Sequence, residues 1–455
     1  MKVRSESALR RTCGYSLVIL VCVLALGSCH KTAKEETSRP PTITFVGWGP
    51  ATFHELVADR NIVDEFTKQT GIPVDFIPGP ESMTDRLQLY KEYLSRKSPT
   101  PDVYYLDVIW PGELADDMLD LEELLAKEAK DELPSAIEND TVNGKLVAMP
   151  FNIELALLYY RQDLLKKYGY GHPPETWDEL EKMAAKIQAG ERAAGNHDFW
   201  GYVWQGAAYE GLTCNAFEWQ VSYGGGQIIE PDGAVSVNNP RAIQAIKRAK
   251  SWIGKISPPS VTAFREQDSV NVFNAGNAAF ARDWIWREYP RPNLNPVIRE
   301  RIAIALMPSG PARRASTMGG QSLAISKYSK HPKEAAAFLQ FLTSRETQLE
   351  LWKEQAMFPG IREFYENPKY RQSRPDIDQI WDQLQRTVVA RPSTISGKHY
   401  DQVSRAYFGA VHSVLTNETT AEKAFAELEK KLKGIMAPPG QAPSASPVAA
   451  NGHTE

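Results

Sequence analysis

The sequence predicts an α/β protein in which a mainly parallel sheet is covered by helices on both faces. Short apolar segments rich in β-branched and aromatic residues alternate with longer segments of helical periodicity. The expected first strands are residues 42–46, 73–77 and 102–106, and the expected helices between them are residues 55–70 and about 82–95. Strands separated by helices of this length favour parallel pairing with both sheet faces covered.

Two side chains follow the expected first and third strands directly. Trp48 lies just beyond the first strand and Asp107 just beyond the third. Ligands of open α/β sheets bind beyond the carboxyl ends of the strands, so both residues are candidates for a binding site. For Asp107, capping of the following turn is the alternative.

The stretch of residues 143–188 continues the alternation of strand and helix. A turn at Asn143-Gly144 precedes the apolar residues 146–149, and Pro150 is expected to end this strand or to place it at a sheet edge. A second apolar run, residues 155–160, has the length of a buried strand. Thr176 and Glu179 form a capping-box pattern, which predicts the start of a helix.

Later segments add further candidates. Residues 302–306 are an apolar strand-like run, and helices are expected at residues 332–343, 401–415 and 420–432. Residues 200–219 are dense in aromatic rings and carboxylates. Aromatic faces match the apolar faces of a pyranose and carboxylates accept from its hydroxyls, although a run of tryptophans is also typical of a core.

The order of several motifs resembles the sugar-binding proteins of bacterial ABC importers (solute-binding protein family 1), and in particular their trehalose and maltose branch. The motifs are Pro101-Asp102-Val103, Gly144-Lys145-Leu146, Leu158-Tyr159-Tyr160-Arg161, Trp204-Gln205-Gly206, Tyr209-Glu210-Gly211-Leu212 and Phe273 to Phe280 followed by Trp284. The resemblance covers about residues 43–432. It implies a type II periplasmic-binding-protein fold, with a ligand cleft between two lobes that three hinge crossings join. The implied lobes are residues 42–149 with 303–358, and residues 150–302 with 359–436.

The resemblance also implies a set of ligand-binding residues. They are Trp48, Asp107, Asn152, Glu154, Glu210, Trp284, Gly320, Gln321 and Arg391. Trp284 is expected to stack on the sugar, with Trp286 as the substitute, and backbone amides at Gly319 and Gly320 are expected to approach it closely. Relatives often carry a tryptophan where Gln321 stands, which puts one stacking contact in question. For Glu154 the alternative is a solvated carboxylate on a strand, and for Arg391 a surface position.

The N-terminal residues 1–28 have the pattern of a signal peptide, with basic residues before a short apolar run. The end of this run, Leu26-Gly27-Ser28-Cys29, resembles a bacterial lipobox and implies lipidation of Cys29. Residues 29–41 are expected to be a flexible tether and residues 437–455 a disordered tail. Cys214 would then be the one free thiol of the mature chain, so no intramolecular disulfide is expected.

Charge and motif content narrow the function. The formal charge of −4 becomes −7 when residues 1–28, with four positive charges and one negative, are removed, so nucleic acid is not an expected partner. Metal and nucleophile motifs such as HExxH and GxSxG are missing, and no cofactor or metal is expected.

The sequence therefore predicts a monomeric, non-enzymatic lipoprotein outside the cytoplasmic membrane. Its expected partners are a sugar such as trehalose or maltose, and the permease and ATPase of an ABC importer. The alternatives are a binding protein for an oligosaccharide or a glycerol phosphodiester, and a secreted glycosidase that uses two of Asp107, Glu154 and Glu210.

Overall fold

The structure, a computed structural model, describes residues 40–47, 62–80, 83–284, 296–355, 357–373, 375–378, 381 and 385–437. The predicted signal peptide, Cys29, Trp48, Trp286 and all but the first residue of the predicted tail lie outside the described residues. The same holds for the tether, apart from Pro40 and Pro41.

The first strands form the expected parallel arrangement. Strand β1 (Ile43–Gly47) lies between β2 (Val74–Pro78) and β3 (Val103–Asp107) and is parallel to both. Helices α2 (Ile62–Thr70) and α3 (Met83–Ser95) connect them. These bounds confirm the strands and the second helix predicted from the sequence, and the described part of the first helix.

Two long strands extend this sheet. Strand β6 (Met149–Arg161) is one continuous strand of 13 residues, so the expectation that Pro150 ends a strand was wrong. Strand β10 (Ser316–Ile325) runs antiparallel between β3 and β6, and its register shifts between Gln321 and Ser322, opposite Pro150. A proline that lacks an N–H is tolerated at such an irregularity, which explains why β6 continues through it. The alternative, a position at a sheet edge, agrees with the pairing, because Pro150 pairs with β10 whereas β11 (Phe358–Pro359) and β8 (Ala278–Trp284) pair with β6 from Asn152 onward.

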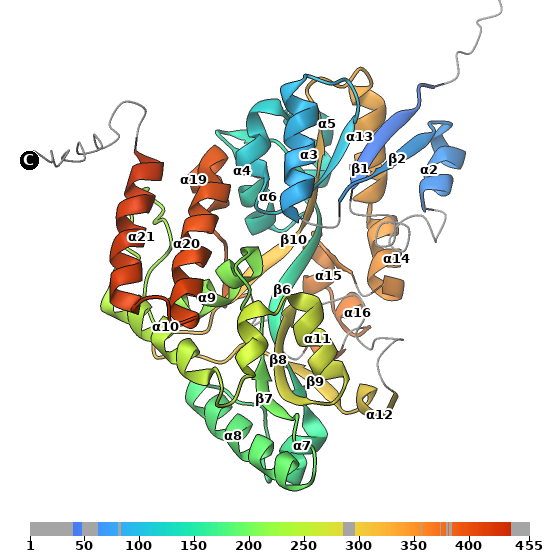
Figure 1. Ribbon diagram of the computed structural model, residues 1–455. Coiled ribbons are helices and arrows are strands. Elements are labelled where there is room, and N and C mark those ends of the chain that lie inside the picture. Colours follow the sequence, from blue (N-terminus) through green and yellow to red (C-terminus); the bar gives the residue numbers. More distant parts are fainter. Residues whose placement is uncertain are drawn as a thin grey trace, which may run out of the picture. The chain divides into compact units, whose positions relative to one another are not determined.

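The second half of β6 pairs with a different set of strands. Strands β8 (Ala278–Trp284) and β9 (Ile302–Ala305) are antiparallel to it, and β7 (Trp200–Val203) is parallel to β8. The resulting order is β2-β1-β3-β10-β6-β8-β7. Figure 1 shows β6 running from the strands of the N-terminal region to β7 and β8.

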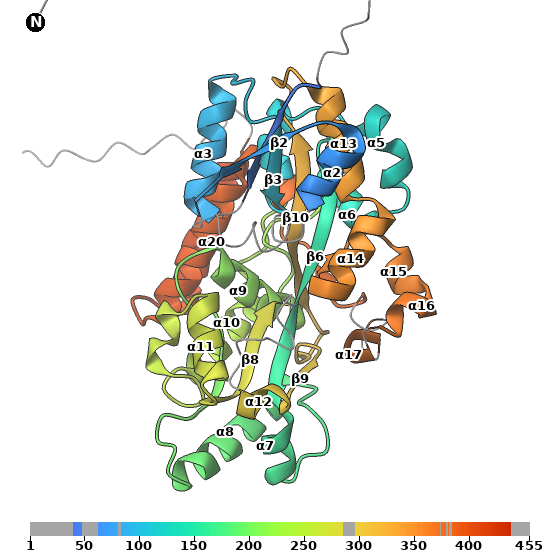
Figure 2. The same ribbon diagram turned by 90° about the vertical axis from the view of Figure 1, so that its right-hand side faces the viewer.

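Helices α8 (Trp177–Ala193) and α11 (Glu266–Asn274) pack against β7 and β8, and α7 (Gln162–Lys167) lies next to α8. Figure 2 shows α11 beside β8. Helices α9 (Glu210–Ser222), α10 (Pro240–Trp252) and α20 (Tyr400–Leu415) pack on one another, and α21 (Ala421–Met436) packs on α10 and α20. Helix α8 begins as predicted, because the Thr176 side chain accepts a hydrogen bond from the Glu179 amide. The Glu179 carboxylate reaches back one residue further than a capping box requires, to the Glu175 amide.

Shorter elements complete the chain. They are α4 (Pro111–Leu114), α5 (Glu122–Ala129), α6 (Pro134–Asp140), β4 (Thr141–Val142), β5 (Lys145–Leu146), α12 (Pro296–Arg299), α13 (Pro332–Leu342), α14 (Arg345–Gln355), β11 (Phe358–Pro359), α15 (Glu363–Glu366), α16 (Pro368–Arg371), α17 (Pro375–Asp378), β12 (Val388–Val389) and α19 (Ser393–Ser396). No helix within the described ranges combines the length and the apolar character that crossing a membrane needs.

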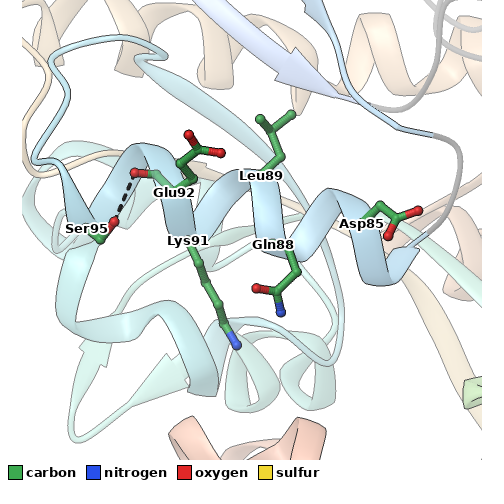
Figure 3. A pocket seen from close by; sticks show the side chains of 6 residues that line it. All are labelled: Asp85, Gln88, Leu89, Lys91, Glu92 and Ser95. Atoms are coloured by element: carbon green, nitrogen blue, oxygen red, sulfur yellow. Dashed lines mark hydrogen bonds between the residues drawn. The ribbon is translucent and has the colours of Figure 1, made fainter.

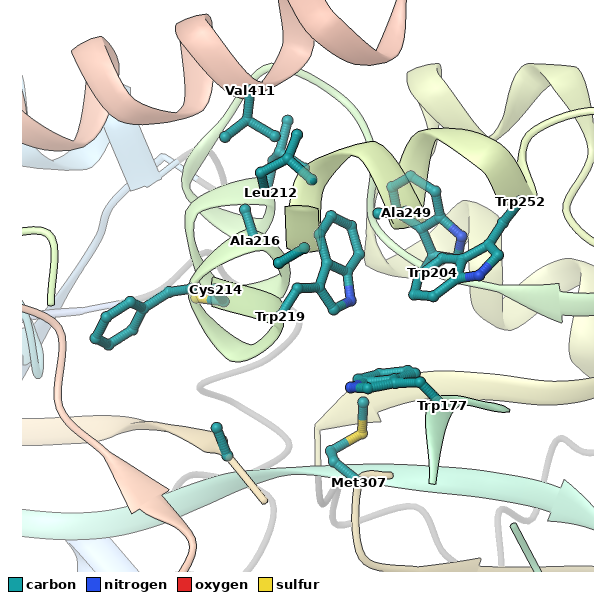
Figure 4. Close-up of a cluster of buried hydrophobic side chains, with 14 of the residues drawn as sticks. Trp177, Trp204, Leu212, Cys214, Ala216, Trp219, Ala249, Trp252, Met307 and Val411 are labelled. Carbon is teal, nitrogen blue, oxygen red and sulfur yellow. The ribbon is translucent and has the colours of Figure 1, made fainter. Parts of the chain in front are cut away.

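The buried apolar side chains of the described residues form four clusters, and two of them lie on different parts of the sheet. One packs β1, β3 and α13 around Phe45, Tyr105 and Phe338. The other lies under α8, α9 and α10 and contains five tryptophans. Trp177, Trp204, Trp219 and Trp252 are labelled in Figure 4, and the fifth is Trp284 at the edge of this cluster. Separate cores of this kind are what two α/β lobes require, because each lobe has to bury its own apolar faces.

Candidate functional site

Three of the predicted site residues lie side by side on adjacent strands. Gln321 of β10 is paired with Asp107 of β3 on one side and with Asn152 of β6 on the other. Asn152 and Gln321 are almost fully buried, and Asp107 is at the end of its strand. Strand pairing therefore collects side chains that are separated by up to 214 positions in the chain.

Glu154 and Trp284 border this row. Glu154 lies two residues beyond Asn152 and so on the same face of β6, opposite Gly319 of β10. A Cβ atom on Gly319 would lie 3.0 Å from the Trp284 ring and 3.4 Å from the Glu154 Cβ. The missing side chain of Gly319 thus lets the carboxyl group and the indole approach one another.

Gly320 is required by the backbone. Its φ angle is +117°, and a Cβ atom there would lie 2.2 Å from the carbonyl oxygen of Asn152. Only glycine adopts this conformation without strain. Its carbonyl oxygen accepts a hydrogen bond from the Val108 amide at 3.1 Å, which joins β10 to the loop after Asp107.

The polar side chains of the row are partly engaged with one another. Tyr105, a neighbour that the sequence analysis missed, donates its hydroxyl to Gln321 Oε1 at 3.1 Å. Asn152 Nδ2 lies 3.5 Å from Glu154 Oε1, whereas Asn152 Oδ1 is buried and has no partner among the described residues. A buried acceptor without a partner is costly unless a ligand or water satisfies it.

The alternative role considered for Asp107 is also present. Its Oδ1 accepts a hydrogen bond from the Ile109 amide at 3.2 Å, which caps the turn after β3. The same oxygen lies 3.9 Å from the Arg391 guanidinium. Asp107 therefore both stabilises the turn and faces the site.

Burial changes the protonation of two carboxyl groups. It raises the pKa of Glu154 to about 8, and the nearby Asp107 carboxylate adds to the effect. Burial also raises the pKa of Asp107, although the Arg391 charge and the Ile109 amide oppose the change. At neutral pH Glu154 is thus a protonated carboxyl group, which can donate one hydrogen bond as well as accept.

Arg391 and Glu210 form an ion pair beside Asp107. Arg391 Nη1 lies 2.7 Å from Glu210 Oε1, and its Nη2 donates to the Met318 carbonyl oxygen at 3.2 Å. Tyr400 and Ser404 also donate to the Glu210 carboxylate, each at 2.5 Å. The carboxylate of Glu210 is therefore already occupied by three side chains and holds Arg391 in place.

Ser404 was not among the residues predicted for the site. It lies one helical turn after Tyr400 on α20, so the helical period would have indicated that the two hydroxyls share a face. Arg391 itself is 7% exposed, so its alternative assignment to the surface was wrong.

Trp284 is the last residue of β8 and is 8% exposed. Its carbonyl oxygen accepts a hydrogen bond from the Tyr159 hydroxyl at 2.9 Å. The guanidinium carbon of Arg282 lies 4.1 Å from the centroid of its indole ring. The buried Arg282 guanidinium therefore covers the Trp284 ring, and the Tyr159 hydroxyl binds the Trp284 backbone.

The aromatic segment of residues 200–219 contributes little to the site. Tyr202, Trp204 and Trp219 are at most 1% exposed and belong to the core cluster of Figure 4. Of the candidates in this segment, Glu210 alone reaches Arg391.

A surface depression on α3 lies apart from these residues. It has a volume of about 570 Å³ and is lined by Asp85, Gln88, Leu89, Lys91, Glu92 and Ser95 (Figure 3). All of its lining residues come from one helix, and no predicted site residue is among them. In the described parts of the chain, no group of three His, Cys, Asp or Glu side chains could hold a metal ion.

Residues 49–349 match the family model of bacterial extracellular solute-binding proteins. The chain belongs to this family. It is 42% identical over 374 residues to a probable ABC transporter-binding protein of Deinococcus radiodurans, which covers 82% of this chain and 89% of that protein.

Solved structures show the same fold. The maltose-bound MalE3 of T. maritima is 35% identical, with a TM-score of 0.78, and the match covers 86% of this chain and 99% of MalE3. A solute-binding protein of Thermotoga lettingae bound with α-D-tagatose has a TM-score of 0.76 at 23% identity, over 88% and 100% of the two chains. The predicted two-lobed α/β fold is thus confirmed, and this solute-binding protein shares it with sugar-binding proteins.

Proposed function

We propose that this solute-binding protein captures a neutral sugar, a disaccharide such as trehalose or maltose, and delivers it to an ABC importer. The observation that carries the proposal is the row of Asp107, Gln321 and Asn152 on three adjacent strands, bordered by Glu154 and the Trp284 indole. A sugar needs polar groups for its hydroxyls and an aromatic face for its apolar side, and this row offers both.

The charge of the site favours a neutral ligand over a phosphodiester. Its carboxyl groups are Asp107, Glu154 and Glu210, and Arg391, which reaches Asp107 and Glu210, is already paired with Glu210. A phosphate group would meet excess negative charge and would have to compete with Glu210 for Arg391. Sugar hydroxyls carry no charge and would pair with the same carboxyl groups as donors.

Closure of the lobes provides the signal to the importer in this proposal. Asp107 belongs to the proposed lobe of residues 42–149 and 303–358, and Arg391 to the lobe of residues 150–302 and 359–436. The distance of 3.9 Å between Asp107 Oδ1 and Arg391 Nη2 supports a closed state in which both side chains contact the ligand. Ligand binding would favour this state by hinge motion, and the permease would recognise it.

The proposal places the protein outside the cytoplasmic membrane, as a monomer anchored by lipid on Cys29 and tethered by residues 29–41. It binds its ligand without a cofactor or metal and carries out no chemistry on it.

One observation favours a second function. A glycosidase protonates the leaving group with a carboxyl group of raised pKa, and burial raises the pKa of Glu154 to about 8. Long incubation of the protein with a bound disaccharide separates the two functions, because a binding protein returns the disaccharide intact. Release of monosaccharides that depends on Glu154 would establish the glycosidase instead.

The proposal is tested by a thermal-shift screen of the chain from residue 30 onward. The panel contains trehalose, maltose, sucrose, maltodextrins, monosaccharides and glycerol phosphodiesters. A ligand at a hundred times its dissociation constant stabilises the folded state by about 2.7 kcal/mol. We expect a disaccharide to raise the midpoint and Asp107→Ala or Trp284→Ala to abolish the rise. A shift with phosphodiesters alone, or with none of the compounds, would contradict the proposal.

A further inference from the structure

We infer that the buried ion pair of Arg282 and Glu218 is a positioning device that fixes the indole of Trp284 in the ligand site. The inference rests on the proposed function for its consequence on binding, whereas the positioning itself can be measured without a ligand. Neither Arg282 nor Glu218 was a candidate from the sequence, and neither touches the ligand in this account.

The first step is the contact between Arg282 and Trp284. Arg282 and Trp284 are two residues apart on β8, so both side chains project from the same face of the strand. The guanidinium carbon is 4.1 Å from the ring centroid, within the range of a cation–π interaction, and Arg282 is fully buried. One face of the indole is therefore covered by a cation from which water is excluded.

The second step is that the guanidinium cannot turn. Its Nη2 is 2.6 Å from Glu218 Oε1, and its Nε is 3.3 Å from Glu218 Oε2, so the carboxylate is held by a fork of two donors. Nη2 also donates to Thr317 Oγ1 at 3.0 Å, and Nη1 to Gln205 Oε1 at 3.3 Å. These contacts with Glu218, Thr317 and Gln205 fix the plane of the Arg282 guanidinium. The Trp284 indole packs against this fixed plane.

The third step is that the partners of Arg282 are held in turn. Glu218 Oε1 accepts from the Thr317 amide at 3.2 Å and also from the Thr317 hydroxyl. Gln205 donates to Ser269 Oγ at 2.7 Å and to the Arg282 carbonyl oxygen at 3.0 Å. All of these residues are fully buried, so the network has no solvent contact through which it could relax.

The network joins the elements that build the site. Glu218 lies on α9, the helix that begins with Glu210, while Arg282 lies on β8. Thr317 lies on β10 two residues before Gly319, whose missing side chain accommodates the Trp284 ring. A change at the ion pair would therefore move the indole relative to both Gly319 and Glu154.

Stability alone does not account for such a pair. Replacing a buried ion pair by apolar side chains of similar volume is often neutral or stabilising, because the desolvation of two charges offsets their attraction. A fully hydrogen-bonded ion pair fixes the orientation of its side chains, which apolar side chains cannot do. Here the group that receives this orientation is the aromatic ring of the proposed ligand site.

The chain offers a matched control. Arg192 of α8 stacks on Trp200 of β7 with its guanidinium carbon 4.3 Å from the ring centroid, and both residues are partly exposed. The distance from the guanidinium to the ring is similar to that of Arg282 and Trp284, but none of the proposed ligand residues takes part. Arg192→Met therefore removes an equivalent contact without touching the site.

The positioning is tested by fluorine NMR of the protein labelled with 5-fluorotryptophan. Trp284→Phe and Trp200→Phe assign the two resonances. In Arg282→Met we expect the Trp284 resonance to shift and broaden, as the ring samples several orientations, while that of Trp200 stays in place. In Arg192→Met the reverse is expected. An unchanged Trp284 resonance in folded Arg282→Met would overturn the inference.

The consequence for binding is tested by calorimetric titration with maltose. Arg282→Met should weaken maltose binding at least about tenfold, equivalent to 1.4 kcal/mol, while Arg192→Met binds as the unchanged protein does. Arg282→Lys should not restore affinity, because an ammonium cannot form the planar fork.

If Arg282→Met does not fold, Glu218→Gln replaces it, since this change keeps the shape of the side chain and removes the charge. Unchanged maltose affinity in a folded variant that lacks the ion pair would refute the role in binding. If the unchanged protein binds neither maltose nor another saccharide of the panel, the proposed function fails. The fluorine spectra then still decide whether Arg282 positions Trp284.

Discussion

Two groups of tryptophans in this protein have nearly the same burial but different surroundings. Trp177, Trp204, Trp219 and Trp252 are between 0% and 3% exposed, and Trp284 is 8% exposed. The first four pack on one another, with ring centroids 5.0 Å apart for Trp204 and Trp219 and 5.6 Å apart for Trp219 and Trp252. Trp284 belongs to the same apolar cluster, but it also packs against the Arg282 guanidinium and borders Gly319 and the Glu154 carboxyl group.

This difference shows that a high density of aromatic residues in a sequence segment does not by itself indicate a sugar site. In the core cluster, aromatic rings and aliphatic chains fill the space around each indole, and polar atoms such as Trp204 Nε1 are satisfied by side chains of the protein. At Trp284, the missing side chain of Gly319 lets the ring pack closely against β10, next to the Glu154 side chain. The neighbours of a tryptophan, rather than its segment, distinguish a core residue from a site residue.

The largest expected effect comes from the core group. Trp219→Ala should lower the free energy of unfolding by about 3–5 kcal/mol, because it leaves a large cavity between Trp204 and Trp252. Urea denaturation measures the change. Ligand affinity, determined at a temperature where the variant is folded, should stay the same, and a loss of affinity there would break the distinction between the two groups.

A smaller effect is expected at the polar border of Trp284. Asp107→Asn keeps an oxygen that can cap the Ile109 amide but removes the charge that faces Arg391 and the ligand. We expect the unfolding free energy to change little and the ligand affinity to fall by about 1.5–3 kcal/mol, the strength of a hydrogen bond to a charged group. Calorimetric titration and denaturation of the same sample measure both quantities. Equal losses of stability and affinity would show that Asp107 acts only through its turn.

The site should also differ from the core in its response to pH. The folded-state pKa of Glu154 is about 8, above its ordinary value of 4.5, so the folded state binds a proton that the unfolded state has released. Stability should therefore fall as the pH rises through this window, by up to about 1.4 kcal/mol per pH unit. Thermal unfolding from pH 5 to pH 8 measures the slope, and Glu154→Gln should make it shallower. An identical slope in the variant would exclude the buried protonated carboxyl group.

The smallest expected effect lies within the core group itself. Trp204 Nε1 donates to Ser257 at 3.0 Å, whereas the Nε1 of Trp219 is buried without a partner in the described residues. Trp204→Phe should consequently destabilise the protein more than Trp219→Phe, by about 1 kcal/mol, the net contribution of one hydrogen bond. Chemical denaturation of the two variants compares them directly, and the reverse order would show that packing outweighs the hydrogen bond.

Local periodicity predicted much of the fold. The helix expected at residues 332–343 is α13, Pro332–Leu342, and the helices expected near the C-terminus are α20 and α21. Each has an apolar face that its own sequence specifies. Pro150 does not end its strand, because the pairing of β6 with β10, a strand about 170 residues later in the chain, shifts its register there.

Residue types at short spacings predicted the alternation of strands and helices, the family and the candidates at strand ends. Tertiary structure alone decided that Asp107, Gln321 and Asn152 share one row, that Glu210 holds Arg391, and that Glu218 pairs with Arg282 across 64 positions. The physical reason is that pairing between strands and burial of charge depend on contacts distant in sequence. No local pattern of residues encodes those contacts.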